Sequence, residues 1–249
     1  MASTRPKRFI VAADNHGDMV DPQAKAAIMA FARDFAPDIA VHLGDNWDFR
    51  NLRKGASDDE KASSLEDDWE QGREFLREFL SHGKTTRVFL RGNHDERVWR
   101  FRESATGLLR DYAADGIKRI EGILKQARAT MLPYDAADGI YRMGKLAMLH
   151  GYHVGVGAVR QHAAIYGSVI FGHTHTIESS PVASTSPAEA RSIGCLCRKN
   201  MSYINAKTGK LRWSHGWAYG FLFDDGSYQL FQAREINNQY HAATEIKTY

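Results

Sequence analysis

Cysteine and proline are scarce in this chain of 249 residues, which contains two cysteines and six prolines. Cys195 and Cys197 are too close in sequence for an ordinary structural disulfide and too few for a disulfide scaffold, so they suit a reducing cytoplasm. Neither thiol is expected to be catalytic. With 43% hydrophobic and 25% charged residues and no low-complexity tract, the composition excludes collagen-like, coiled-coil and disordered proteins.

Long apolar runs are also lacking. The longest uncharged ones, such as Phe9–Ala13 and Ser168–Gly172, are far shorter than the ~20 residues that a membrane span needs. The segment Met1–Arg8 has no apolar region of the kind found in signal peptides. We therefore expect a cytoplasmic protein that makes no use of a membrane.

Neither sign of charge dominates the chain, which has 33 basic and 30 acidic residues. This balance does not indicate nucleic-acid binding by the protein as a whole. The segment 190–223 differs, since it has no Asp or Glu and holds basic residues interleaved with tryptophans: Arg191, Arg198, Lys199, Lys207, Lys210, Arg212, Trp213 and Trp217. Such a segment can hold a phosphate backbone and stack bases, or it can be a strand edge whose lysines discourage aggregation.

The length suits one domain, 1–249, with insertions, and no linker divides it. Short apolar runs alternate with amphipathic patterns, which predicts parallel βαβ units. The expected strands cover 8–14, 38–44, 85–90, 146–150 and 168–172, and the expected helices cover 22–35 and 57–79. A helical cap insertion is expected at about 96–131. An antiparallel C-terminal part is expected at about 177–235, with a turn at Asp224–Ser227.

Five of the apolar strands end in carboxylate, imidazole or amide side chains. These ends read Asp14-Asn15-His16, Gly44-Asp45-Asn46-Trp47-Asp48, Gly92-Asn93-His94-Asp95, His150-Gly151 and Gly172-His173-Thr174-His175. In an open α/β sheet the C-terminal strand ends line one crevice, so these residues are expected to converge. They suit a divalent transition metal, and they are too many for one tetrahedral ion. Two metal ions that share a carboxylate fit better.

The order of these blocks resembles the calcineurin-like metallophosphoesterase superfamily, whose pattern runs D-x-H, GDxxD, GNH[DE], H, GHxH. All five blocks are present in that order, over roughly residues 8–176. The resemblance implies a four-layer α/β/β/α sandwich with two mixed sheets. It also implies hydrolysis of a phosphate ester by two divalent metal ions, manganese first, with iron, zinc or nickel as alternatives.

Carried over position by position, the resemblance implies two sets of metal ligands. The first set is Asp14, His16, Asp45 and His175, and the second is Asp45, Asn93, His150 and His173, with Asp45 bridging the two ions. Two such ions lower the pKa of a bridging water and generate hydroxide for in-line attack. His94 would then be the general acid that protonates the leaving oxygen, and Asp48 would orient it.

Three functions are compatible with these residues. The favoured one is hydrolysis of a phosphodiester, with DNA or RNA among the substrates, because the ligand blocks resemble those of SbcD-type nucleases and because of the basic segment. The second is a phosphomonoesterase that acts on a nucleotide or phosphoprotein, with the insertion closing the site to polymers. The third is a non-catalytic scaffold. Protein phosphatase activity is disfavoured, because Phe49 stands where Ser/Thr protein phosphatases have an arginine after the second aspartate.

Other polar residues have simpler explanations. His42 lies within an apolar strand and is expected to be a hydrogen-bonded core histidine. His153 competes with His150 for the role of ligand. His162 and His215 have no motif around them and are expected at the surface.

Overall fold

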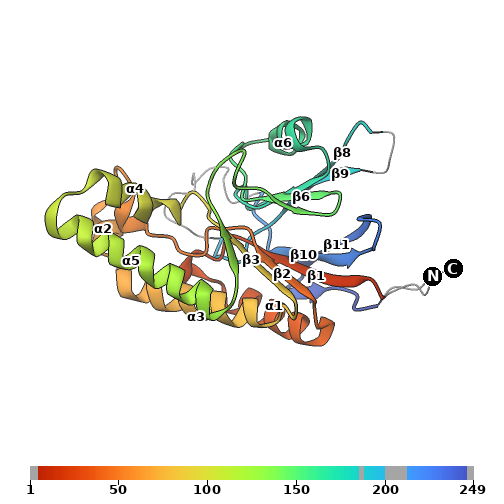
Figure 1. Cartoon of the computed structure of the whole chain (residues 1–249), viewed down its shortest axis with the longest axis horizontal. Coiled ribbons are helices and arrows are strands. Elements are labelled where there is room, and N and C mark those ends of the chain that lie inside the picture. The colour runs from red at the N-terminus through yellow and green to blue at the C-terminus, as the bar shows by residue number, and fades with distance from the viewer. Residues whose placement is uncertain (1–4, 185–187, 200–211, 246–249) are drawn as a thin grey trace.

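The computed structural model describes residues 5–184, 188–199 and 212–245. Its strands form two sheets (Figure 1). The strands are β1 (Lys7–Ala12), β2 (Ile39–His42), β3 (Thr86–Leu90), β4 (Thr130–Leu132), β5 (Tyr141–Met143), β6 (Leu146–Leu149), β7 (Val169–Phe171), β8 (Ile177–Pro181), β9 (Glu189–Ile193), β10 (Gly216–Leu222), β11 (Tyr228–Ile236) and β12 (Gln239–His241).

The larger sheet has the strand order β12-β11-β10-β1-β2-β3-β4 in the described part of the chain. Strands β1 to β4 are parallel, whereas β10 pairs with β1 in the antiparallel direction, and β11 and β12 follow it, each antiparallel to the strand before. The smaller sheet has the order β5-β6-β7-β9-β8, with β6, β7 and β9 parallel. Both sheets are therefore mixed, as predicted.

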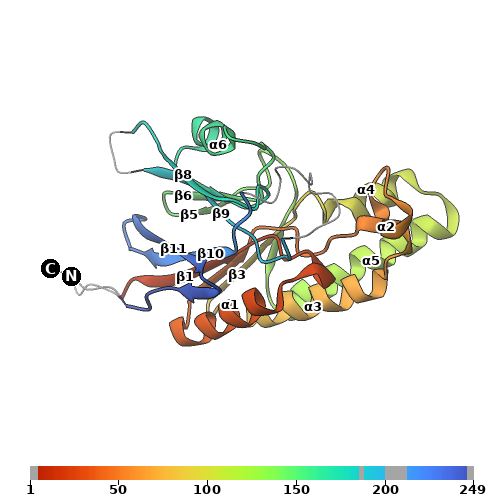
Figure 2. The ribbon, with the colours of Figure 1, turned by 180° about the vertical axis from the view of Figure 1, so that it is seen from behind.

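Helices cover the outer face of each sheet, and the inner faces pack on each other. The helices are α1 (Pro22–Phe35), α2 (Asp58–Ala62), α3 (Leu65–Ser81), α4 (Glu96–Ser104), α5 (Gly107–Gln126) and α6 (Ala158–Tyr166), with short 3-10 turns η1 (Gly17–Met19) and η2 (Arg50–Leu52). Figures 1 and 2 show α1 and α3 against the larger sheet, α5 beside α3 and α4, and α6 over the smaller sheet. The four-layer α/β/β/α fold predicted from the sequence is confirmed.

Alternation along β1 divides the core between these layers. Ile10 packs in the cluster formed with α1, α3 and α5, whereas Phe9 and Val11 pack in the cluster shared with the smaller sheet and α6. Successive side chains of a strand point to opposite faces, so a strand with helices on one side and a second sheet on the other is apolar throughout. This explains the uninterrupted apolar run that marks β1 in the sequence.

The predicted helix 22–35 agrees with α1. Its N-terminal cap is Asp21, whose carboxylate accepts hydrogen bonds from the backbone N–H groups of Gln23 and Ala24, and Pro22 occupies the first turn. The prediction of one continuous helix over 57–79 is wrong, because the segment forms two helices. Ser64 caps a new helix by accepting from the N–H of Asp67, so the segment divides into α2 and α3.

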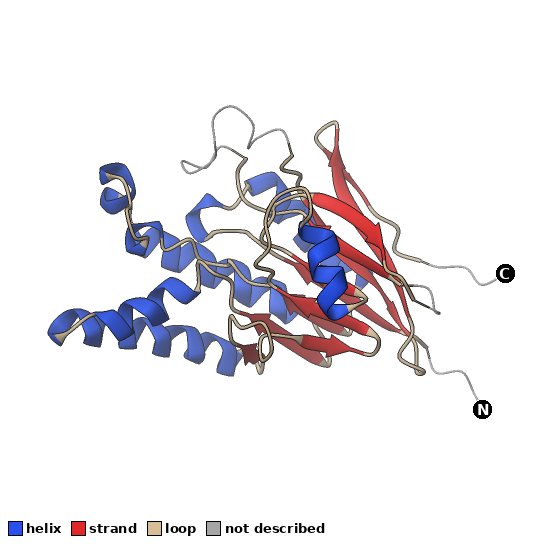
Figure 3. Ribbon diagram, turned by 90° about the horizontal axis from the view of Figure 1, so that it is seen from above, coloured by secondary structure: helices blue, strands red, loops and turns tan. Residues whose placement is uncertain are grey.

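The segment 96–131 is helical only as far as Gln126. Its last residues form β4, which pairs with β3 and completes that edge of the larger sheet. In Figure 3 the helices extend past the strands on one side. The C-terminal strands are antiparallel to their neighbours except β9, which is parallel to β7, and the predicted turn at Asp224–Ser227 joins β10 to β11. No helix among the described residues is both long and apolar enough to cross a membrane.

Candidate metal centre

The polar residues predicted as ligands lie a few positions beyond the C-terminal ends of β1, β2, β3, β6 and β7. The structure brings them together. Potential ligand atoms of Asp14, His16 and Asp45 lie within 4.8 Å of one another, and so do those of Asp45, His150 and His173. Asp45 therefore belongs to both groups, which is the arrangement expected of a bridging carboxylate.

The two oxygens of Asp45 have different surroundings. Oδ1 accepts a hydrogen bond of 2.8 Å from the backbone N–H of His94, which fixes the orientation of the carboxylate. Oδ2 lies 3.4 Å from Nε2 of His150 and 3.8 Å from Nε2 of His16. Because these nitrogens converge on Oδ2 from different strands, this oxygen marks the middle of the centre.

On one side of Asp45, ring nitrogens face each other directly. Nε2 of His16 lies 3.2 Å from Nε2 of His175, which is also 3.4 Å from Oδ1 of Asp14. Two neutral imidazoles in this position direct lone pairs at each other unless a proton or a cation lies between them. A divalent ion between His16, His175 and the two carboxylates satisfies all of these atoms, so the donor set fits a metal.

The other side of Asp45 has a similar composition. Oδ1 of Asn93 lies 3.0 Å from Nε2 of His150. Nδ1 of His150 donates to the carbonyl of Leu43 at 2.9 Å, so the ring presents Nε2 to Asp45. The rings of His150 and His173 are 5.2 Å apart. His153 instead packs on Tyr152 and His162, so the structure places His150 among the predicted ligands.

The backbone at this centre is unusual. Five of the predicted ligands adopt left-handed φ angles of 52° to 65°, namely Asp14, His16, Asp45, His173 and His175. This region is sparsely populated by residues other than glycine, and such residues gather at functional sites. Close approach also requires Gly172, where a Cβ atom would lie 2.5 Å from Oδ2 of Asp14.

His94 and Asp48 contact each other as predicted. Nδ1 of His94 lies 2.5 Å from Oδ1 of Asp48, and both side chains are buried. The structure adds Arg97, which donates to the backbone oxygen of Asp48 at 2.7 Å and whose Nη2 lies 3.1 Å from Nε2 of His94. Since a guanidinium has no acceptor, Nε2 of His94 accepts in this arrangement.

Burial and charge set the protonation of the ligands. Burial lowers the pKa values of His173 and His175 to about 3, so both rings are neutral and offer lone pairs. Burial also lowers the pKa of His150, but the charges of Asp45 and Asp14 outweigh it and raise the value to about 9. Burial raises the pKa of Asp45, yet His150 and His94 hold it well below the ordinary value.

Asp95 has a structural role that was not predicted from the sequence. Its buried carboxylate accepts from the backbone N–H groups of Asp45, Asn46, Trp47 and Gly92, at 2.8 to 3.1 Å. It thereby joins the loop after β2 to the loop after β3. The signal available in the sequence was the acidic fourth position of the Gly-Asn-His-Asp block.

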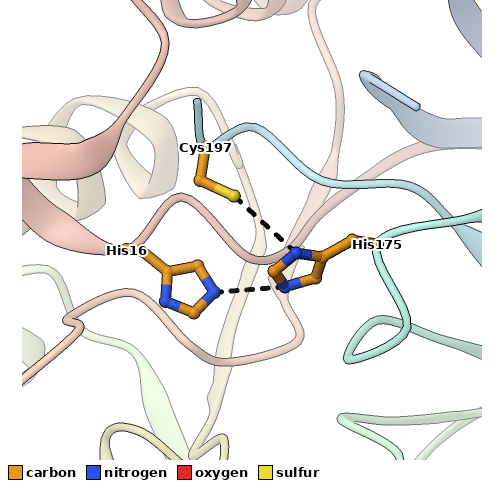
Figure 4. A group of neighbouring side chains, drawn as sticks. All are labelled: His16, His175 and Cys197. Carbon is orange, nitrogen blue, oxygen red and sulfur yellow. Dashed lines mark hydrogen bonds between the residues drawn. The ribbon is translucent and has the colours of Figure 1, made fainter. Parts of the chain in front are cut away.

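Cys197 was also missed. Its sulfur lies 3.8 Å from Nδ1 of His175, and ligand atoms of His16, His175 and Cys197 lie within 4.8 Å of one another (Figure 4). No sequence pattern links this cysteine to the Gly-His-Thr-His block. The sequence interpretation was only that neither thiol is catalytic, and it gave Cys197 no place beside the site.

Two histidine predictions are wrong. His162 is completely buried, with Nδ1 donating to the carbonyl of Ala158, and His215 is 4% exposed. Both have backbone hydrogen-bond partners that make burial favourable. His42 agrees with its prediction, because it is buried and bonded to Oδ1 of Asn15 at 2.8 Å.

The basic segment 190–223 is partly neutralised. Its described cations include three that are paired with carboxylates, in the pairs Arg191–Glu189, Lys199–Glu235 and Arg212–Glu178. Trp217 is 1% exposed in the core and has no face for a base, whereas Trp213 lies against His175 with ring centroids 4.0 Å apart. Lys207 and Lys210 lie outside the described residues.

No protein-family model and no curated protein matches the chain. An archaeal phosphodiesterase of solved structure is 17% identical, covers 90% of this chain and 99% of its own, and gives a TM-score of 0.44. Vps29 from Entamoeba histolytica, complexed with zinc, is 11% identical, with 94% and 96% covered and a TM-score of 0.47. The phosphoesterase YfcE from E. coli is 18% identical, with 90% and 97% covered and a TM-score of 0.38.

Similarities this distant identify neither a substrate nor a reaction. The chain's own residues are more informative. Its two packed mixed sheets, its covering helices and its five ordered blocks, gathered around Asp45, are the features that the resemblance to the calcineurin-like metallophosphoesterase superfamily implies.

Proposed function

We propose that the chain is a phosphoesterase that binds two divalent metal ions and hydrolyses a phosphodiester. The observation that carries the proposal is the convergence of ring nitrogens from His16 and His150 on Oδ2 of Asp45, with Asp14, Asn93, His173 and His175 around them. Ligands from different strands surround one carboxylate oxygen, which is the arrangement that two-metal hydrolysis needs.

The seven residues Asp14, His16, Asp45, Asn93, His150, His173 and His175 would hold the ions. When bound, the ions supply Lewis acidity to the phosphoryl group and lower the pKa of a coordinated water. Manganese is the metal that we would supply first, because carboxylate and amide oxygens suit it, and iron and zinc, which imidazole suits, would follow.

His94 is the group that would protonate the leaving oxygen. Asp48 holds its Nδ1, so its Nε2 faces Asp45 Oδ2 at 3.9 Å. A proton on Nε2 is incompatible with the present contact to Arg97, because two donors would face each other. We therefore place Arg97 on a phosphoryl oxygen once the substrate is bound, which leaves Nε2 of His94 to the leaving group.

The charges beside the centre support a diester over a monoester. Besides Arg97, which we place on the substrate, the two neighbouring guanidinium groups are paired with carboxylates, Arg50 with Asp18 and Arg91 with Glu96. A monoester dianion brings more negative charge than a diester and needs more unpaired cationic groups. A singly charged diester requires less compensation.

The test compares turnover of bis-p-nitrophenyl phosphate and p-nitrophenyl phosphate by the manganese-loaded protein, with Asp45→Asn as the blank. We expect faster turnover of the diester. Preference for the monoester would overturn the diester assignment, and no turnover of either compound would favour the scaffold. If the diester is preferred, DNA and RNA are the next substrates to compare.

A further inference from the structure

The two nitrogens of the His175 ring have different neighbours. Nε2 faces the proposed metal position, 3.2 Å from Nε2 of His16 and 3.4 Å from Oδ1 of Asp14. Nδ1 faces away from it and lies 3.8 Å from the sulfur of Cys197, as Figure 4 shows. The sulfur therefore contacts the ring nitrogen that does not face the proposed metal position, while it also lies within 4.8 Å of a ring nitrogen of His16.

A histidine that binds a metal through one nitrogen usually donates its other N–H to a carboxylate, a carbonyl or a water. That hydrogen bond fixes the tautomer and the orientation of the ring. Here a thiol sulfur, a weak acceptor, stands in the position of that partner. We propose that Cys197 is a positioning residue, whose sulfur accepts from Nδ1–H of His175 and so directs the Nε2 lone pair to the metal.

The position of Cys197 is itself fixed from two directions. Its carbonyl accepts from Nε2 of His215 at 2.8 Å, and Nδ1 of His215 lies 3.0 Å from Oε2 of Glu235. Lys199 donates to the same carboxylate oxygen at 2.7 Å. This chain of polar contacts anchors the cysteine to β11 and accounts for the burial of His215.

The second set of contacts joins the segment around Cys197 to the loop that carries the predicted ligands Asp14 and His16. The N–H of Leu196 donates to the carbonyl of Asp14 at 3.1 Å, and the N–H of Arg198 donates to the carbonyl of Met19 at 2.8 Å. Cys197 is thus bracketed by hydrogen bonds to residues on either side of His16. These bonds join the backbone on both sides of Cys197 to the segment that carries Asp14 and His16.

This inference rests on the proposed function only in taking His175 as a metal ligand. The experiment measures metal binding rather than turnover. Metal-free protein is titrated with Mn²⁺ and with Co²⁺, for the wild type and for Cys197→Ala, Cys197→Ser and Cys195→Ala. Cys195 is the matched control, because it is equally buried two positions away but its sulfur faces the carbonyls of Cys197 and Ser214. Thermal unfolding confirms that each variant is folded.

We expect Cys197→Ala to weaken binding of one ion about 10- to 100-fold, the effect typical of losing such a partner. Cys197→Ser, which keeps an acceptor, is expected to lose less, and Cys195→Ala to bind as the wild type does. The Co²⁺ spectrum of the wild type is expected to lack thiolate-to-metal charge transfer in the near ultraviolet.

Three results would overturn the proposal. A charge-transfer band that disappears in Cys197→Ala would make the thiol a direct ligand. Equal losses in Cys195→Ala and Cys197→Ala would indicate packing alone, and unchanged affinity in Cys197→Ala would remove any role. A wild-type protein that binds neither ion would instead contradict the proposed function itself.

Discussion

The carboxylate of Asp95 accepts hydrogen bonds from the backbone N–H of Asp45, at 2.8 Å, and from three further backbone N–H groups. The residue that lies at the middle of the proposed metal centre is therefore held in place by a second carboxylate that contacts no metal position. The left-handed backbone of Asp45 persists because this network stabilises it.

Replacing Asp95 by alanine should lower the free energy of unfolding by about 3 kcal/mol or more, because several buried N–H groups lose their acceptor at once. Urea denaturation of the metal-free protein measures this loss. Asp115→Ala removes an exposed carboxylate from α5 and should change stability by less than ~0.5 kcal/mol. Similar values for both variants would contradict the structural role of Asp95.

Asp45 and His94 should give different phenotypes. Asp45→Asn removes a charge from both ligand sets and should lower metal occupancy together with the rate. His94→Ala should keep both ions and lose about 10²- to 10⁴-fold in kcat, most with poor leaving groups. Metal content by elemental analysis, beside kcat, separates the two. Loss of metal from His94→Ala would contradict the assignment of Asn93 as the ligand and His94 as the acid.

Metal binding should release protons. Without metal, His150 has a pKa of about 9, and burial together with the charge of Asp45 raises the pKa of Asp14 to about 7. An ion must displace the His150 proton below pH 9 and the Asp14 proton below pH 7. Affinity should therefore rise with pH and level off above about pH 9. Calorimetry in buffers of different ionisation enthalpy counts the protons, and a pH-independent affinity would refute this expectation.

Gly172 should not tolerate a methyl group, because a Cβ atom there would lie 2.5 Å from Oδ2 of Asp14. Gly172→Ala should displace that carboxylate and reduce both metal occupancy and the melting temperature. Gly122, within α5, has nothing within 4 Å of an added Cβ. Gly122→Ala should therefore raise stability by up to ~1 kcal/mol through helix propensity. Equal tolerance at both positions would contradict the close approach of Gly172 to the centre.

The sequence predicted the parts of the molecule that depend on local pattern. The cap at Asp21 and the apolar spacing of α1 defined that helix, and the apolar runs before Asp14 and Asp45 located their strands. The convergence of the predicted ligands could be expected because those strands are parallel, so their C-terminal ends meet at one edge of the sheet.

Other features depend on contacts between distant residues. The burial of His162 and His215 has no periodic signal, since each ring is satisfied by backbone groups that the fold supplies. Cys197 lies beside His175 because the segment after β9 bonds to the Asp14 loop. The division of 57–79 could have been found locally, because Ser57 and Glu60 form a capping box and Ser64 starts the next helix.

The location of bound metal tests the central claim most directly. A crystal grown with manganese and measured at the manganese absorption edge should show two anomalous peaks about 3.5–4 Å apart, one on each side of Asp45. One peak should lie among Asp14, His16 and His175, and the other among Asn93, His150 and His173. A single peak, or peaks that do not share Asp45, would contradict the two-metal account.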